Sequence, residues 1–254
     1  MTDLIVFSVS ANKYAIKIEN IQRIIQSVSL TDIPNANRLI DGMMSYEDSV
    51  IKILNFRKLI GLPTYDDELS ILFKNLKEAH KVWIDELQHS VEHGTVFTKT
   101  TNPHECELGI WLDNFNSYDE RVTTILKDLD TNHKNLHIGG GEVISQYKHD
   151  KELALDMFKT NINDIYNRTM GDLDIFINEL DKVANSLQKL LIYENNGKTF
   201  AIKVDSIEDI VHIEETDLIS SDIEEKNNDF LELDGVLDLD GVLINVIKTV
   251  SLPS

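Results

Sequence analysis

The first quarter of the chain alternates short hydrophobic runs with turn-forming residues, a pattern that is typical of β-strands. Residues 4–9 are mostly apolar, and residues 14–18 alternate apolar and polar side chains with a period of two. Residues 50–54 form a third stretch of the same kind. We therefore expect this part of the chain to form half-buried strands.

The last quarter of the chain resembles the first. The sequence YAIKIENI at residues 14–21 aligns with FAIKVDSI at residues 200–207. Residues 41–54 align without a gap to residues 234–247, and both segments begin with Asp-Gly. An internal repeat of strands explains this similarity. The alternative is two unrelated sets of alternating strands.

Residues 68–189 have a different period. Hydrophobic side chains recur every three or four residues between 69 and 91, which predicts an amphipathic helix that ends at Gly94. The same spacing predicts a second helix from Tyr118 to Leu129 and a long last helix over residues 155–187.

The three consecutive glycines at residues 139–141 make the end of the second helix ambiguous. Residues 143–147 either form a helix of their own or continue the second helix through the glycines. Each glycine costs roughly 1 kcal/mol in a helix relative to alanine, so a continuous helix requires a packing reason.

These patterns together predict an α+β multidomain chain. Residues 1–65 and 190–254 are expected to form one discontinuous all-β domain of two small β-barrels. Residues 66–189 are expected to form an inserted α-helical domain, a four-helix bundle. The two ends of an up-down bundle lie side by side, so such a domain can be inserted into a loop without pulling that loop apart.

The charge balance narrows the possible partners. With 44 acidic and 24 basic side chains, the net charge is -20, so we expect no binding to nucleic acid or to an anionic membrane surface. No apolar run reaches the roughly 18 residues of a spanning helix, so we expect no membrane insertion. The chain has one cysteine, and the start Met1-Thr2-Asp3 lacks the pattern of a signal peptide. Both features favour a cytoplasmic protein.

Three of the eight histidines fall on helix faces that we expect to be buried. His80 lies on the apolar stripe of the first predicted helix, and His133 and His137 extend the apolar face of the second. His89 and His93 point to the opposite side of the first helix, so we interpret them as surface residues.

A buried neutral imidazole costs free energy unless it finds a partner. A single histidine of this kind is best explained as a hydrogen-bonded core residue. Three of them beside the only cysteine favour a shared metal ion instead. The thiolate of Cys106 with His80, His133 and His137 is a closed tetrahedral ligand set for Zn2+.

Residues 68–185 resemble the chemoreceptor zinc-binding (CZB) domain. The pattern consists of an early helical histidine, a Cys-x-hydrophobic-Gly-x-aromatic element and a late His-x-x-x-His. Here these are His80, Cys106-Glu107-Leu108-Gly109-Ile110-Trp111 and His133-Lys134-Asn135-Leu136-His137. The resemblance implies one zinc ion at His80, Cys106, His133 and His137.

The two flanks resemble the CheW-like chemotaxis coupling domain. The matching positions are Tyr14 to Ile21, Pro34, Gly42, Leu59 to Leu62, Asp205, Gly235 and Asp240-Gly241. This resemblance implies that the β domain binds methyl-accepting chemoreceptors and the histidine kinase CheA.

One stretch departs from the pattern of the CheW-like family. Members usually carry Asn-hydrophobic-Arg-Gly followed by a strand proline, whereas this chain has Ser45-Tyr46-Glu47-Asp48 and then Lys52. The change from Arg to Glu47 reverses the charge where family members contact receptor or kinase. We therefore expect altered binding to the usual partners, with the fold retained.

The leading functional hypothesis is a chemotaxis signalling adaptor whose helical domain senses zinc or an oxidant. An alternative is a divergent adaptor with a purely structural zinc bundle. A zinc hydrolase is a third hypothesis, but a catalytic zinc usually keeps an open position beside three protein ligands. The four ligands expected here leave no such position, and no His-Glu-x-x-His sequence is present. We therefore expect no enzymatic activity.

Overall fold

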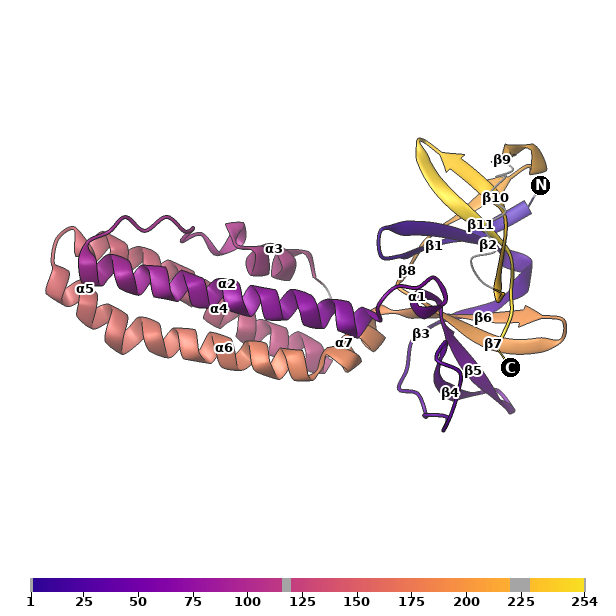
Figure 1. Ribbon diagram of the computed structural model, residues 1–254, viewed down its shortest axis with the longest axis horizontal. Helices are drawn as coiled ribbons and strands as arrows, with labels where there is room; N and C mark the ends of the chain where they lie inside the picture. Colours follow the sequence, from indigo (N-terminus) through magenta and orange to yellow (C-terminus); the bar gives the residue numbers. More distant parts are fainter. Residues whose placement is uncertain (1, 116–119, 220–228, 254) are drawn as a thin grey trace. The chain divides into compact units, whose positions relative to one another are not determined.

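The computed structural model describes residues 2–115, 120–219 and 229–253. The chain divides into an all-β unit, Met1–Tyr65 with Ala184–Ser254, and a helical unit, Asp66–Val183. Figure 1 traces both units by sequence colour. Within the described ranges, no helix combines the length and the hydrophobicity needed to cross a membrane.

The described residues of the β unit form two sheets. The larger has the strand order β8-β1-β2-β11-β10-β9, and the smaller has the order β3-β6-β7-β5-β4. The strands are β1 (Thr2–Val9), β2 (Asn12–Lys17), β3 (Ile21–Gln26), β4 (Ile40–Tyr46), β5 (Ser49–Asn55), β6 (Lys189–Asn195), β7 (Lys198–Val204), β8 (Ser206–Ile213), β9 (Leu218–Ile219), β10 (Leu231–Leu239) and β11 (Val242–Val250). The short helix α1 (Phe56–Leu59) follows β5.

Each sheet contains strands from both flanks of the chain. β8 pairs antiparallel with β1 and β3 with β6, while β11 runs parallel to β2 and β5 runs parallel to β7. The smaller sheet takes the strand order of the larger one without β9 when β3, β4 and β5 are replaced by β8, β10 and β11, and β6 and β7 by β1 and β2. The topology therefore confirms the internal repeat and the discontinuous β domain.

Two glycines occupy equivalent places in this repeat. Gly42 has φ 152° and Gly235 has φ 157°, and each lies at a register shift of its hairpin. A Cβ on Gly42 would lie 2.7 Å from the carbonyl oxygen of Thr31, and one on Gly235 would lie 2.8 Å from that of Ile219. Both positions therefore require glycine, because the chain passes close by and the backbone is left-handed.

The expectation of two small β-barrels was wrong, since neither sheet closes on itself within the described residues. In the larger sheet the edge strand β9 has only two residues, too few to form a ladder with β8 at the opposite edge. In the smaller sheet, Thr31 in the segment after β3 bridges Met43 on the outer edge of β4. That segment occupies the edge which β3 would need for closure.

Among its described residues, the helical unit has three long helical elements, the short helix α3 and the 3-10 helix Pro103–Glu105. Its elements are α2 (Tyr65–His93), α3 (Glu107–Asn114), α4 (Glu120–Tyr147), α5 (Lys151–Met157), the π-helical turn η3 (Phe158–Ile162) and α6 (Asn163–Asn178), and α7 (Leu180–Leu187) leads out of it. Gly94, with φ 74°, ends α2 as expected. Tyr118, the expected start of the second helix, lies outside the described residues.

Helix α4 continues through all three glycines, and close packing explains why. A Cβ on Gly140 would lie 2.4 Å from the Trp83 ring of α2, and one on Gly139 would lie 2.6 Å from Ile162. The glycines cost helix propensity but allow these large side chains to pack directly against the backbone of α4.

The long last helix is interrupted twice. The turn η3 is π-helical, and it places Phe158 and Ile162, each 1% exposed, in the core. A second break occurs at Glu179, whose carboxylate binds Arg121 of α4 and Lys182 of α7, each at 2.6 Å. Neither break could be read from the regular spacing of the hydrophobic residues.

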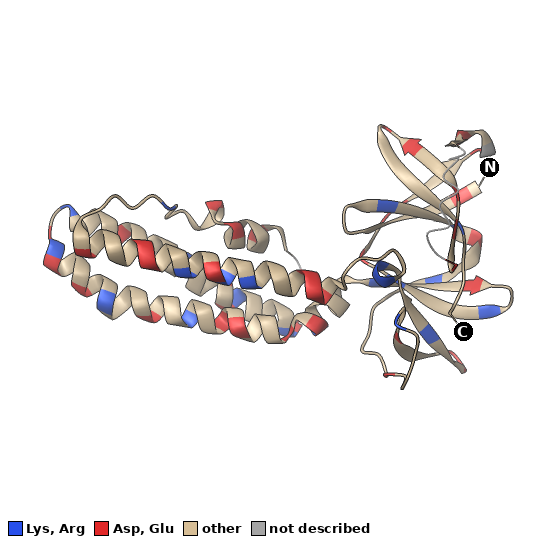
Figure 2. Cartoon of the chain, in the orientation of Figure 1, with Lys and Arg blue, Asp and Glu red and all other residues tan. Residues whose placement is uncertain are grey.

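Acidic and basic side chains alternate along the helices. Figure 2 shows Lys and Arg interspersed with the more numerous Asp and Glu. Local pairs result, such as Lys134 with Asp130 at 2.7 Å, one helical turn apart. Exposed pairs of this kind stabilise a helix by only about 0.3–0.5 kcal/mol each.

Candidate metal centre

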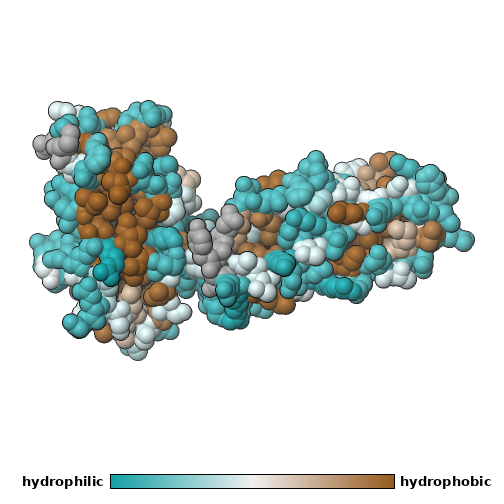
Figure 3. Space-filling model, turned by 180° about the vertical axis from the view of Figure 1, so that it is seen from behind, coloured by the Kyte–Doolittle hydropathy of each residue, from teal (hydrophilic) through white to brown (hydrophobic). Residues whose placement is uncertain are grey.

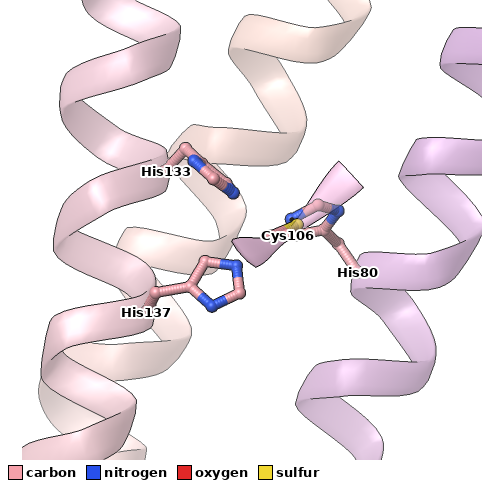
Figure 4. A group of neighbouring side chains, drawn as sticks. All are labelled: His80, Cys106, His133 and His137. Atoms are coloured by element: carbon pink, nitrogen blue, oxygen red, sulfur yellow. Dashed lines mark hydrogen bonds between the residues drawn. The ribbon is translucent and has the colours of Figure 1, made fainter. Parts of the chain in front are cut away.

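The four residues expected to bind a metal lie together inside the helical unit. His80 comes from α2, Cys106 from the residue before α3, and His133 and His137 from consecutive turns of α4. One ligand atom from each can be chosen so that all four lie within 4.8 Å of one another. Figure 4 shows the side chains converging from three separate segments.

Local structure brings Cys106 to this position. Asn102 caps the short 3-10 helix Pro103–Glu105, accepting a hydrogen bond from the His104 amide, and Cys106 follows directly. A Cβ on Gly109 would lie 1.8 Å from the Pro103 carbonyl oxygen and 3.1 Å from the His133 ring. Glycine is therefore required where α3 passes between the Cys106 segment and α4.

Two backbone carbonyls orient two of the imidazoles. His80 Nδ1 donates to the Leu76 carbonyl at 2.7 Å, and His137 Nδ1 donates to the Thr100 carbonyl at 3.2 Å. The Nε2 atoms of both rings are then free to face the cluster, and His80 Nε2 lies 3.4 Å from Cys106 Sγ. Such carbonyl contacts fix the tautomer and the orientation of metal-binding histidines.

The buried nitrogen atoms that remain have no protein partner. His80, His133 and His137 are 2%, 0% and 1% exposed. Three of their nitrogen atoms, both ring nitrogens of His133 and Nε2 of His137, make no hydrogen bond to any described residue. Buried polar atoms without partners are costly, so these atoms indicate a ligand that all of them share.

Burial also keeps the imidazoles neutral. It lowers the pKa of His133 to about 2, with a further contribution from His137, and it lowers the pKa of His137 to about 4. Burial lowers the pKa of His80 as well, and it raises the pKa of the Cys106 thiol. Three lone pairs are thus available at neutral pH, and the thiol loses its proton when it binds a metal.

The donor set fits zinc in number and type. Ligand atoms on a tetrahedral zinc lie about 3.3–3.6 Å apart, given bonds of about 2.0–2.3 Å. The separation of 3.4 Å between Cys106 Sγ and His80 Nε2 already matches. The widest separation, 4.8 Å, requires the side chains to close by about 1 Å around an ion.

Sequence reasoning missed the residues that support the ligands. Trp83 packs against His137 with ring centroids 4.9 Å apart. Its indole Nε1 donates to the same Thr100 carbonyl at 2.9 Å. Trp83 belongs to the hydrophobic spacing between residues 69 and 91, but nothing in the sequence shows that Thr100 lies beside both rings.

The remaining histidines are not part of the cluster. His89 and His93 are exposed on α2, which confirms their interpretation as surface residues. His104 contacts Asp113 at 2.7 Å, and His212 contacts Asp3 at 2.6 Å.

Two family models match parts of the chain. A family model described as CheW-like domain matches residues 3–84, and one described as chemoreceptor zinc-binding domain matches residues 65–144. The second match includes all four clustered residues. No curated protein matches the chain.

Solved structures that are similar to the chain include the following two. Scaffolding protein TtCheW from Thermoanaerobacter tengcongensis is 11% identical, with 97% of this chain and 88% of that chain covered and a TM-score of 0.46. The regulatory CZB domain of DgcZ is 19% identical, with 45% of this chain and 98% of that chain covered and a TM-score of 0.37. From the two family matches, the chain combines a CheW-like domain with a chemoreceptor zinc-binding domain.

Proposed function

We propose that the chain is a cytoplasmic chemotaxis adaptor whose helical unit binds one Zn2+ and reports zinc or an oxidant to the β unit. The β unit binds chemoreceptors and the CheA kinase in this account. One observation carries the proposal above all others. His133 is fully buried, neutral at pH 7, without a hydrogen-bond partner among the described residues, and grouped with three further side chains of types that can bind a metal.

The four ligands act by joining segments that are otherwise held by packing alone. Bound zinc would supply a shared positive centre for one thiolate and three imidazoles. His80 would then be fixed to α4 through His133 and His137, and Cys106 would fix the loop before α3 to both helices. Loss of the metal returns these buried nitrogen atoms to their unpartnered state, which favours a looser packing of α2 against α4.

The chain offers a direct route from the helical unit to the β unit. α7 ends at Leu187, and β6 begins at Lys189, with only Gln188 between them. β6 pairs with β3 of the first flank as well as with β7. A change in the helices that displaces α7 therefore acts on a strand that connects the two flanks.

Two other functions remain as alternatives. A purely structural zinc bundle would bind the same metal without changing partner binding when zinc is removed. A zinc hydrolase would need an open coordination position for water, which four protein ligands do not leave. We therefore propose that the chain is not an enzyme.

Two features of the β unit bear on partner binding, an apolar patch and the altered β4–β5 hairpin. Figure 3 shows a continuous hydrophobic patch on one face of the β unit, a kind of surface that often binds proteins. Glu47 is exposed at the β4–β5 turn with φ 51°, and Lys52 is exposed on β5. A glutamate at this turn is expected to weaken contacts that an arginine makes in other CheW-like domains.

Affinity for chemoreceptor and CheA fragments, measured with and without a zinc chelator, tests the proposal. The zinc-loaded chain should bind at least one of them, and chelation should change the affinity several-fold. Glu47→Arg should strengthen binding, with Asp48→Asn as a control that alters charge at the neighbouring position. Unchanged binding after chelation would favour the structural alternative, and no binding by either the native chain or the Glu47→Arg variant would contradict the adaptor.

A further inference from the structure

His89 and His93 lie one turn apart on the solvent-exposed side of α2. Their ring centroids are 4.5 Å apart, and the ring planes are inclined by 55°. Both residues are exposed, and neither ring makes a hydrogen bond to any described residue. Their four ring nitrogen atoms therefore have no hydrogen-bond partner among the described residues.

Two imidazoles at positions i and i+4 of a helix can bind the same metal ion, because their side chains leave the helix on the same face. Imidazole nitrogen suits divalent zinc, copper and nickel. The exposed residues His104 and His212 differ in this respect, because each has its Nδ1 atom engaged by a carboxylate, on Asp113 and Asp3 respectively.

We propose that His89 and His93 form a second metal site, which takes one divalent transition-metal ion. Two imidazoles supply the protein ligands, and water fills the remaining coordination positions. The net charge of -20 supports this site by raising the concentration of cations near the surface. Because the ion keeps open positions, this site can also take a ligand from a second molecule, unlike the closed centre inside the unit.

The second site is separate from the buried one. His89 follows His80 by nine residues, which is about 13 Å along the axis and half a turn around the helix. The buried centre offers four ligands and excludes water, whereas the exposed pair offers two and competes with water for the ion. The exposed pair should therefore bind more weakly and fill only after the buried centre.

Nickel binding to the zinc-loaded full chain tests this proposal, since Ni2+ does not oxidise the thiol. Calorimetric titration of the native chain should reveal one nickel ion, and His89→Gln/His93→Gln should weaken its binding at least tenfold. The single variants should lose nearly as much, because chelation needs both rings. The control His149→Gln/His212→Gln removes two exposed histidines that do not form an i, i+4 pair, and it should bind nickel as the native chain does.

Paramagnetic broadening by Ni2+ locates the site. Amide signals at the C-terminal end of α2 should broaden in the native chain and stay sharp in the His89→Gln/His93→Gln variant. The same broadening should persist in a Cys106→Ala/His133→Ala background, so failure of the buried zinc site would not hide it. The proposal is wrong if the pair variant binds nickel as tightly as the native chain, or if the control variant loses the same affinity.

Discussion

Arg57 and Asp205 form a buried ion pair between the two flanks of the β unit. The Arg57 side chain is 1% exposed, its Nε lies 2.8 and 2.9 Å from the two Asp205 oxygens, and its Nη2 lies 2.6 Å from Oδ2. Arg57 also donates to the Pro63 carbonyl and lies over the Tyr65 ring, while Gln188 donates to Asp205. The ion pair thus contacts the segment before α2 through Pro63 and the residue after α7 through Gln188.

Breaking this pair should destabilise the β unit strongly. Asp205→Asn leaves a buried guanidinium without its counter-ion, a change that costs about 3–5 kcal/mol. Arg57→Met/Asp205→Leu removes both charges and should cost clearly less than the sum of the two single changes. Urea denaturation of the β unit measures these losses. Additive losses, or a loss below about 1 kcal/mol for Asp205→Asn, would show that the two residues are not coupled.

Gly140 and Gly171 should respond in opposite directions to alanine. A Cβ on Gly140 would meet Trp83 at 2.4 Å, whereas one on Gly171 meets nothing within 4 Å. Gly140→Ala should destabilise the helical unit by about 1 kcal/mol or more and lower zinc affinity, because Trp83 packs against His137. Gly171→Ala in α6 should stabilise the unit by about 0.5–1 kcal/mol. Thermal unfolding of both variants measures these effects. Equal changes of the same sign in the two melting temperatures would contradict the packing account.

Zinc binding should release close to one proton at neutral pH. The pKa of His133, about 2, and that of His137, about 4, leave these rings neutral, so they release none. Burial raises the pKa of Cys106, so its thiol carries a proton until the metal displaces it. Zinc affinity should therefore rise about tenfold per pH unit around neutrality.

Calorimetry in buffers of different ionisation enthalpy counts these protons. The Cys106→Ser variant should bind zinc far more weakly, and its affinity should depend little on pH between 6 and 8. Release of two or three protons by the native chain would mean that the histidines are charged before zinc binds, contrary to their burial.

Cys106 is the expected point of attack for an oxidant. It is the only cysteine, it is half-buried, and oxidation to sulfenic acid would weaken one of four zinc bonds. Hypochlorous acid should produce sulfenate at Cys106 in the zinc-loaded chain and change hydrogen exchange in residues 190–210. An unmodified thiol, or modification without any change in exchange, would assign the site a structural role.

The spacing of hydrophobic residues along the sequence predicted several helices and strands of this structure correctly. Helix α2, its end at Gly94 and the strand repeat follow from residue spacing and residue type. The grouping of His80, Cys106, His133 and His137 was favoured by spacing and completed by the resemblance to the chemoreceptor zinc-binding domain. The Arg57–Asp205 pair joins residues 148 positions apart, so no periodic pattern reveals it. An arginine in the apolar run around Phe56 was the one signal that a buried partner existed.

Features that depend on shape were not predictable in the same way. The continuity of α4 depends on Trp83 filling the space above Gly140, and helix propensity alone argues against it. The break at Glu179 depends on its contacts with Arg121 and Lys182, which the sequence does not specify. The sheets do not close because the edge strand β9 is short and the edge of β4 is already paired with Thr31. The alternation of apolar and polar residues does not predict which strands lie at an edge.

The zinc content of the purified full chain, measured after a weak chelator has removed exposed metal, tests the central claim most directly. The account predicts one zinc per native chain and one per His89→Ala/His93→Ala variant. It predicts almost none in Cys106→Ala/His133→Ala, which should remain folded by circular dichroism. A native chain without zinc, or a full zinc ion in the folded Cys106→Ala/His133→Ala variant, would contradict it.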